Sequence, residues 1–413
     1  MALHLVASRP DPALVRLPWS TPLAEWSDDY VVPLPRGLSR HVVRIVRLGE
    51  RTYAIKETQE EIAFREYRLL RDLQRIGLPA VKPVGVVTGR RDDAGEELPC
   101  ALLTEHLAFS LPYRALFAHG TSAESLPSLV DALVVLLVRL HLADFYWGDV
   151  SLSNVLFRRS AGGFAAYLVD AETGELRPTL SRQMREYDVE VGCENVFAEL
   201  LDLQAGGRIS PSVQGHEIVA LIQKRYHDLW NELTAEEEFS ADQMWRIEQR
   251  IERLNELGFD VDELDIVTDF DGDRIRIQPK AVEAGHHQRE LQALTGLCVE
   301  DGQACRLLND MTAFITHYDL GREDRAIAAN RWLTEVFEPI MRMVPPEARG
   351  KLEPAEIFHE ILVHRWYLSE RAGHEVDLFE TARDYIDTVL KLKPDEQITA
   401  DDADPAEENA LER

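Results

Sequence analysis

An aspartate and an asparagine separated by four residues, Asp149 and Asn154, lie in a short polar segment between apolar stretches. Gly148 precedes the aspartate and allows the backbone to turn there. Sixteen residues after Asn154, the strand-like run 165–169 ends in Asp170. Carboxylate and amide oxygens suit Mg²⁺, and a carboxylate that binds no metal can orient an attacking hydroxyl group. The spacing therefore predicts a centre that handles phosphate groups.

A lysine and a glutamate upstream can complete this centre. Lys56 ends a strand-like run, and Glu66 follows ten residues later on a helix predicted for residues 58–76. An ammonium group at a strand end can pair with phosphate oxygens, but its burial requires a carboxylate partner. We favour Glu66 over Glu60 and Glu61, which begin the same helix and can simply favour its dipole.

Lysine, glutamate, aspartate, asparagine and aspartate, in that order, are the groups with which kinases hold MgATP and transfer its γ-phosphoryl group. The Asp149 and Asn154 spacing alone recurs by chance. It becomes specific because a Leu-His pair precedes it and an apolar strand ending in an aspartate follows it. We predict that Asp149 and Lys56 are catalytic, that Lys56 also contacts ATP, and that Asn154 and Asp170 bind Mg²⁺.

Four further residues are predicted to contact the nucleotide. Gly37 and Ser39 lie in the first predicted turn, where backbone amides and a hydroxyl group can cover phosphates. Glu105 and Leu107 follow the last strand of the first lobe, where such a lobe would hinge onto the next. His41 beside the turn either adds positive charge near the phosphates or belongs to ordinary surface.

The elements that position these residues follow a recognisable order. Three predicted strands, a helix and two strands precede the hinge, and a long apolar helix, the polar segment and a strand pair follow it. The last twenty residues hold eight acids and one arginine, which is typical of a disordered tail. The predicted parts are a lead-in (1–30), an N-lobe (31–106), a C-lobe (107–214), a helical domain (215–393) and the acidic tail (394–413).

The chain resembles the protein-kinase-like superfamily, and most closely its RIO-like and lipopolysaccharide-kinase-like branch. The catalytic loop of that branch tends to contain His-Gly-Asp, and the equivalent here is Trp147-Gly148-Asp149. The similarity covers roughly residues 30 to 210. Proteins described as lipopolysaccharide-kinase-like, with an uncharacterised helical C-terminal domain, are similar over the whole chain. The resemblance implies an α+β class, with a bilobal kinase-like fold followed by a mostly helical domain, and ATP- and Mg²⁺-dependent phosphotransfer.

The sequence departs from the protein-kinase pattern at several positions. Gly148 replaces the arginine that docks a phosphorylated activation loop, and no Ala-Pro-Glu follows Asp170. We therefore expect activity that does not depend on phosphorylation of such a loop. Trp147 replaces the usual histidine and can fill the same packing position. Glu172, two residues after Asp170, is either a further metal ligand or a solvated side chain, and we favour the latter.

The composition of the chain disfavours several classes of function. The net charge is −28, from 73 acids and 45 bases, which disfavours binding to nucleic acid or to an anionic membrane surface. The start of the sequence lacks the features of a signal peptide, and the most apolar run, 133–142, is too short to span a bilayer. The four cysteines have no metal-binding spacing and are expected to be reduced thiols. We predict a cytoplasmic protein.

The predicted function is transfer of phosphate from ATP to a hydroxyl group on a small molecule, a sugar or glycolipid, or a protein. One alternative keeps the fold but transfers AMP. Another is a pseudokinase-like regulatory protein whose nucleotide state controls a protein partner bound by the helical domain. Retention of Lys56, Asp149, Asn154 and Asp170 argues against this last alternative.

Overall fold

The computed structural model describes residues 3–7, 11–27, 30–32, 41–49, 51–118, 125–235, 237–240, 246, 249, 259–268 and 274–397. The chain forms two compact units. The first contains residues 1–158, 166–223 and 397–413, and the second contains residues 159–165 and 224–396. Among the helices of the described residues, none combines the length and the apolar character needed to cross a membrane.

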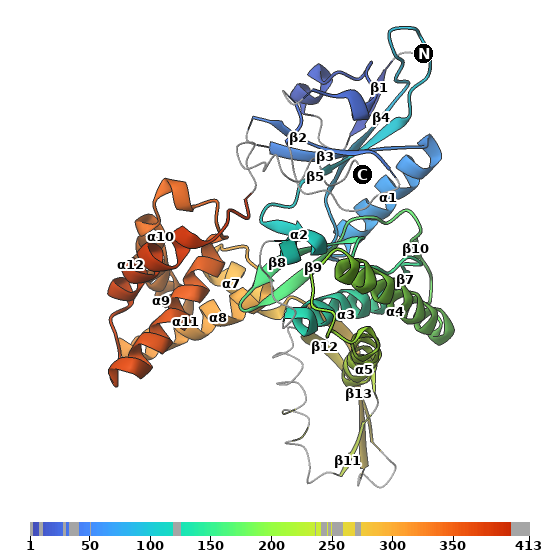
Figure 1. Ribbon diagram of the computed structural model, residues 1–413. Helices are drawn as coiled ribbons and strands as arrows, with labels where there is room; N and C mark the ends of the chain where they lie inside the picture. Colours follow the sequence, from blue (N-terminus) through green and yellow to red (C-terminus); the bar gives the residue numbers. More distant parts are fainter. Residues whose placement is uncertain are drawn as a thin grey trace. The chain divides into compact units, whose positions relative to one another are not determined.

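The first unit begins with an antiparallel five-stranded sheet in the order β1-β4-β5-β3-β2 (Figure 1). Side chains alternate between the two faces of a strand. On β3, Tyr53 and Ile55 are therefore buried in the core of the sheet, while Ala54 and Lys56 lie on the opposite face. The strands are β1 (His4–Ala7), β2 (Val43–Leu48), β3 (Arg51–Thr58), β4 (Pro83–Thr88) and β5 (Cys100–Glu105).

The segment expected to be a lead-in contributes to this lobe. Residues His4–Ala7 form β1, which pairs with β4, and two short 3₁₀ helices follow at Pro12–Arg16 and Leu23–Glu25. The buried rings of Trp19 and Trp26 pack edge to face with their centroids 5.3 Å apart. Such short elements have no periodicity in the sequence, which is why the pattern did not indicate them.

Helix α1 (Glu60–Arg75) packs against β4 and β5. Ala63 and Tyr67 share a small core with Val86 and Leu102. Residues three or four apart lie on one face of a helix, so Glu66 is carried on the same buried side as Ala63 and Tyr67.

The rest of the first unit has the order of elements expected of a C-lobe. Helix α3 is apolar on almost every side, and eleven of its residues are buried, so it forms the centre of the lobe. Asp149 and Asn154 lie on the loop between β7 and β8. The elements are β6 (Ser110–Pro112), α2 (Tyr113–Ala118), α3 (Leu126–Leu142), β7 (Phe145–Tyr146), β8 (Val155–Ser160), β9 (Gly163–Leu168), β10 (Glu175–Leu176), α4 (Arg182–Ala205) and α5 (Gly215–Thr234), which begins in this unit.

The second unit is mainly helical, as the periodicity predicted. The rings of Trp332, Phe337 and Phe358 pack at its core, with centroids 5.3 to 5.9 Å apart. Its helices gather in orange and red in Figure 1. The elements are β11 (Glu237–Ser240), β12 (Phe259–Thr268), β13 (Arg274–Ala284), α7 (His286–Thr295), α8 (Asp301–His317), α9 (Arg325–Trp332), a π-helical turn (Leu333–Phe337), α10 (Glu338–Met343), α11 (Pro354–Ala372) and α12 (Leu378–Thr388).

The tip of the β8–β9 hairpin belongs to this second unit. Glu356 on α11 is 3% exposed, and its Oε2 accepts hydrogen bonds from the Ala161 N–H at 3.0 Å and the Gln303 side chain at 2.9 Å. Arg159 also pairs with Glu396 at 2.6 Å. A buried polar network therefore fixes the hairpin tip.

Replacing Glu356 with alanine is expected to lower the free energy of unfolding by about 2 kcal/mol, because two donors lose their buried acceptor. Thermal or denaturant unfolding of the full chain measures this loss. The control is Glu370→Ala, an exposed glutamate on the same helix, which should change stability little. Equal effects of the two substitutions would contradict the prediction.

Candidate active site

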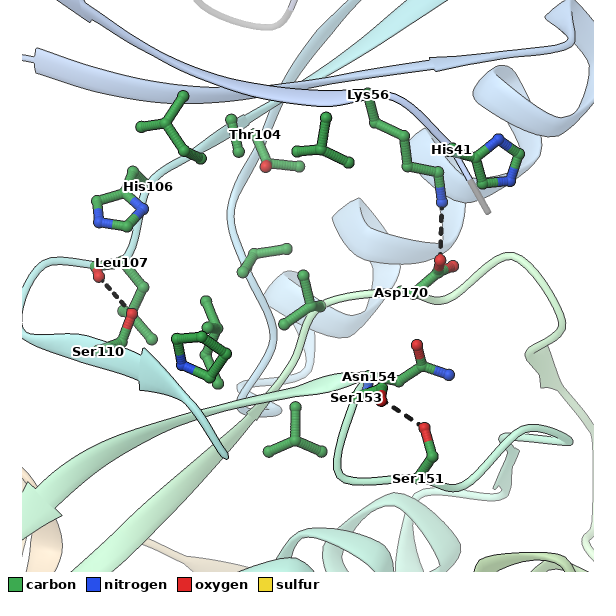
Figure 2. Close-up of a pocket in the computed structure, with 18 of the residues that line it drawn as sticks. His41, Lys56, Thr104, His106, Leu107, Ser110, Ser151, Ser153, Asn154 and Asp170 are labelled. Carbon is green, nitrogen blue, oxygen red and sulfur yellow. Dashed lines mark hydrogen bonds and ion pairs between the residues drawn. The ribbon is translucent and has the colours of Figure 1, made fainter. Parts of the chain in front are cut away.

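A cavity of about 730 Å³ lies in the first unit, beneath the sheet. Six of the predicted site residues line it: Lys56, Glu105, Leu107, Asp149, Asn154 and Asp170. Glu66 lies behind Lys56, as described below. Gly37 and Ser39 lie outside the described residues. Figure 2 shows that the labelled side chains come from strands above the cavity and from the loops and strands below it.

Lys56 is surrounded by three carboxyl groups. Its Nζ lies 2.9 Å from Glu66, 2.9 Å from Asp170 (the dashed line in Figure 2) and 3.3 Å from Glu172. The side chain of Glu66 is 1% exposed, so this pair is deeply buried. Among the described ion pairs of Lys56, α1 contributes Glu66 and neither of the alternatives, Glu60 and Glu61.

Burial and the neighbouring charges act in opposite directions on this group. Burial favours a neutral Lys56, but the carboxylates of Glu66 and Asp170 outweigh it, so its pKa is raised and the ammonium stays charged. Burial, helped by the charges of Asp170 and Glu172, raises the pKa of Glu66 to about 7 against the attraction of Lys56. The cluster therefore has an excess of negative charge around one cation.

The side chain of Asn154 is tied to Asp149. Its Nδ2 donates to the Asp149 Oδ2 and to the Asp149 carbonyl, both at 3.0 Å. Both partners are acceptors only, so the amide nitrogen must face them. The carboxamide oxygen is then the Asn154 atom that can bind a cation.

The backbone before Asp149 is held by a buried acid on α4. Asp188 accepts from the N–H groups of Trp147 at 2.8 Å and Gly148 at 2.7 Å, and lies 3.1 Å from His141 Nε2. Burial lowers the pKa of His141, so the ring is neutral and donates to Asp188. Gly148 has φ +77°, and a Cβ there would lie 3.0 Å from the Tyr146 ring. The glycine is required by this turn.

Sequence reasoning missed the residues of α4 that contact the loop carrying Asp149 and Asn154. Asp188, Gly192, Asn195 and Glu199 follow one another at intervals of four, three and four residues, which places them on one face of the helix. Glu199 accepts from the N–H groups of Leu152 and Ser153 and from the Ser153 hydroxyl at 2.5 to 2.9 Å. The available signal was the recurrence of polar residues and a glycine at helical spacing along α4.

Our prediction that Glu172 is a solvated side chain is wrong. Glu172 is 23% exposed, and its Oε2 lies 3.1 Å from His41 Nε2 in addition to its contact with Lys56. His41 is therefore part of the site. Oxygen atoms of Glu66, Asp170 and Glu172 lie within 4.8 Å of one another, so Glu172 can contribute to a cation site.

The other end of the cavity is formed by the segment that follows β5. The Glu105 N–H donates to the Lys82 carbonyl at 2.8 Å, and the Ser110 hydroxyl donates to the Leu107 carbonyl at 2.6 Å. Burial lowers the pKa of His106, so its ring is uncharged. This segment is held in place, and beside the Glu105 carboxylate it lines the cavity with the neutral ring of His106 and the apolar Leu107.

The donor set fits a magnesium ion. Asn154 and Asp170 offer hard oxygen ligands, and they lie beside a cluster in which carboxyl groups outnumber the single ammonium of Lys56. A divalent cation would offset this excess and attract a triphosphate, which the carboxylates alone would repel.

The pH dependence of the site tests the charge balance around Lys56. We expect kcat/KM for ATP to fall as pH decreases through about 7, because protonation of Glu66 ends its pairing with Lys56. Glu172→Gln removes a charge that raises the pKa of Glu66, so this acid limb should shift to lower pH, by about one unit. Steady-state rates from pH 5 to 9 measure the shift. An acid limb that lies at the same pH in Glu172→Gln as in wild type, or at a higher pH, would contradict the prediction.

Two parts of the chain are similar to known protein families. Residues 44–191 match the lipopolysaccharide kinase (Kdo/WaaP) family, and residues 228–390 match a domain of unknown function, DUF4032. A solved structure, WaaP in complex with acyl carrier protein, is 17% identical with a TM-score of 0.32, and the alignment covers 55% of this chain and 99% of that chain. No curated protein matches the chain. The family match confirms the predicted resemblance and the α+β kinase-like fold.

Proposed function

We propose that this chain, which is similar to the lipopolysaccharide kinase (Kdo/WaaP) family over residues 44–191, transfers the γ-phosphoryl group of ATP to a hydroxyl group with the help of Mg²⁺. The observation that carries the proposal is the convergence of Lys56, Asp149, Asn154 and Asp170 on one cavity. These residues are scattered over more than a hundred positions of the chain. Placement and charge stabilisation are what phosphoryl transfer mainly requires of a protein.

The buried ion pair prepares Lys56 for a triphosphate. Glu66 holds the ammonium group at the floor of the sheet, and the raised pKa of Lys56 keeps it charged. Phosphate oxygens of ATP could then replace Asp170 as a partner of Lys56, and Asp170 and Asn154 would hold the metal ion. A bound Mg²⁺ would neutralise charge that develops on the phosphate oxygens.

Asp149 would act on the acceptor. Its carboxylate lines the cavity on the same loop as Asn154, so a hydroxyl group that enters there can donate a hydrogen bond to it. Asp149 would orient the hydroxyl oxygen towards the γ-phosphate and accept its proton as the new oxygen–phosphorus bond forms, while the bond from the γ-phosphorus to the bridging oxygen breaks and ADP leaves.

The charge of the cavity wall near Asp149 bears on the acceptor. The wall includes Glu199 and Asp202, and its described residues from 149 to 156 and from 195 to 202 contain no lysine or arginine. Arg114 pairs with Asp202 at 3.2 Å and offsets part of this charge, but the acids of the wall still outnumber it. Like charges repel, so an uncharged or cationic acceptor is favoured over an anionic one. We propose a hydroxyl-bearing small molecule, sugar or glycolipid, or protein of this kind, phosphorylated in the cytoplasm, with the helical second unit as the binding site of a protein partner.

The proposal is tested by incubating the full chain with ATP labelled at the γ-phosphate, Mg²⁺ and panels of neutral, cationic and phosphorylated polyols. Transfer of label to a neutral or cationic acceptor, with a product mass increased by one phosphoryl group, supports it. A product that carries AMP would show nucleotidyl transfer instead. Nucleotide binding without turnover, under conditions in which EDTA weakens binding, would favour the regulatory alternative.

A further inference from the structure

We infer that Asn195 is a positioning residue for Asp149, an inference that rests on the proposed phosphotransfer. Asn195 lies on α4, and its Nδ2 donates to the Val150 carbonyl at 3.0 Å and to the Asp149 Oδ1 at 3.3 Å. The other carboxylate oxygen of Asp149 receives the amide of Asn154. Two amides from different elements therefore hold the two oxygens of one carboxylate.

The orientation of the Asn195 amide follows from its surroundings. A carbonyl and a carboxylate are acceptors only, so both require the NH₂ end of the side chain, whose two hydrogens serve both partners. The shorter contact is with the backbone, so Asn195 is anchored on Val150 first, and its second hydrogen then reaches Asp149. In this way the side chain links the direction of the carboxylate to the course of the main chain.

The close approach of α4 to the loop is built into the helix. Gly192 lies one turn before Asn195, and a Cβ there would be only 2.8 Å from a methyl carbon of Val150. Glu199, one turn after Asn195, accepts hydrogen bonds from the backbone N–H groups of Leu152 and Ser153 on the same loop. The glycine thus brings the helix near the loop, and the amide and the carboxylate fix the loop to it.

We assign Asn195 no part in the chemical step itself. Its role is to set the direction in which Asp149 meets the acceptor hydroxyl. Loss of that role should lower kcat and leave the KM for ATP nearly unchanged, because Asn195 contacts Asp149 and Val150 on the loop, at a distance in the chain from Lys56 and Asp170.

The test is Asn195→Asp, which keeps the shape of the side chain, removes both donors and places a second carboxylate beside Asp149. Two carboxyl groups at this distance cannot both be ionised freely, so they share one proton. We expect the acid limb of kcat at saturating MgATP to move up by about one to three pH units, with about a tenfold or larger loss of kcat at neutral pH. The KM for ATP should stay within about twofold of wild type.

A readout without substrate accompanies the kinetics. A carboxyl group whose pKa is raised in the folded state destabilises the fold as pH rises above its value in the unfolded chain. The melting temperature of Asn195→Asp should therefore match wild type near pH 4 and fall below it as pH increases. Asn195→Ala removes the donors without adding charge, so it should lower kcat with no upward shift of the limb.

The controls separate this inference from the proposed function. Asn330→Asp makes the same chemical change at an exposed position on α9 and should leave both profiles unchanged. If wild type transfers phosphate and Asn195→Asp keeps the wild-type pH profile and kcat, the inference is overturned while the function stands. If wild type transfers no phosphate to any acceptor but the pH-dependent loss of stability appears, the contact stands and the proposed function fails.

Discussion

Replacing Asp149 with asparagine is expected to slow phosphoryl transfer by about 10³-fold and to leave the affinity for MgATP unchanged. Asparagine has the same shape but cannot accept the proton of the acceptor hydroxyl, and it can orient that hydroxyl through one oxygen only. Lys56, Asn154 and Asp170 remain, so nucleotide binding is preserved. Steady-state rates with labelled ATP give kcat, and titration calorimetry with a non-hydrolysable ATP analogue gives the affinity.

The matched control for this experiment is Asp72→Asn, the same change at an exposed aspartate on α1. It should keep both the rate and the affinity of wild type. Equal rates for Asp149→Asn and wild type would remove Asp149 from the mechanism and would leave the regulatory alternative as the better explanation of the cavity. A parallel loss of rate and of nucleotide affinity would indicate instead that Asp149 helps to bind the nucleotide.

Local patterns in the sequence were sufficient to predict the position of a residue when that position depends on a single helix or strand. The alternation of β3 turns Tyr53 and Ile55 into the core and therefore places Lys56 on the other face. The helical period of α1 carries Glu66 on the same buried side as Tyr67. Such periodicities determine the side of a strand or helix on which a residue lies, and an ammonium group that is buried then requires a nearby acid.

Residues whose role depends on packing between distant elements were not predictable in the same way. Glu172 meets His41 across 131 positions of the chain, and Asn195 meets Asp149 across 46. Neither side chain belongs to a motif with a fixed spacing. Their partners are determined by the approach of α4 to the loop and of the sheet to the segment after Asp170, which no local pattern contains.

The departure at Gly148 has a physical explanation in the structure. Its φ of +77° is unfavourable for a residue with a side chain, and a Cβ would press against the ring of Tyr146. An arginine at this position, as in many protein kinases, would strain the turn that presents Asp149. The loop is held by Asp188 instead, through two backbone N–H groups that need no particular side chain.

Replacing Asp170 with asparagine is expected to abolish the stabilisation of the protein by MgATP without destabilising the free protein. In the free chain Lys56 keeps Glu66 and Glu172 as partners, and one of three crowded carboxyl groups becomes neutral. Relief of this repulsion should keep the melting temperature of the free protein equal to wild type or raise it.

The binding of MgATP should be weakened by the same substitution, because an amide is a weaker ligand than a carboxylate for a hard divalent cation. Wild type should gain about 3 kcal/mol of stability at a MgATP concentration a hundred times its Kd, and Asp170→Asn should gain almost none at that concentration. Thermal unfolding with and without MgATP measures both effects, with Asp228→Asn on α5, an exposed aspartate, as the control. A variant that melts early on its own would make Asp170 a structural residue. A variant that retains the full increase in melting temperature with MgATP would show that the metal binds elsewhere. Together, the two predicted changes require that Asp170 binds the cation and that the free protein does not need Asp170 for its stability.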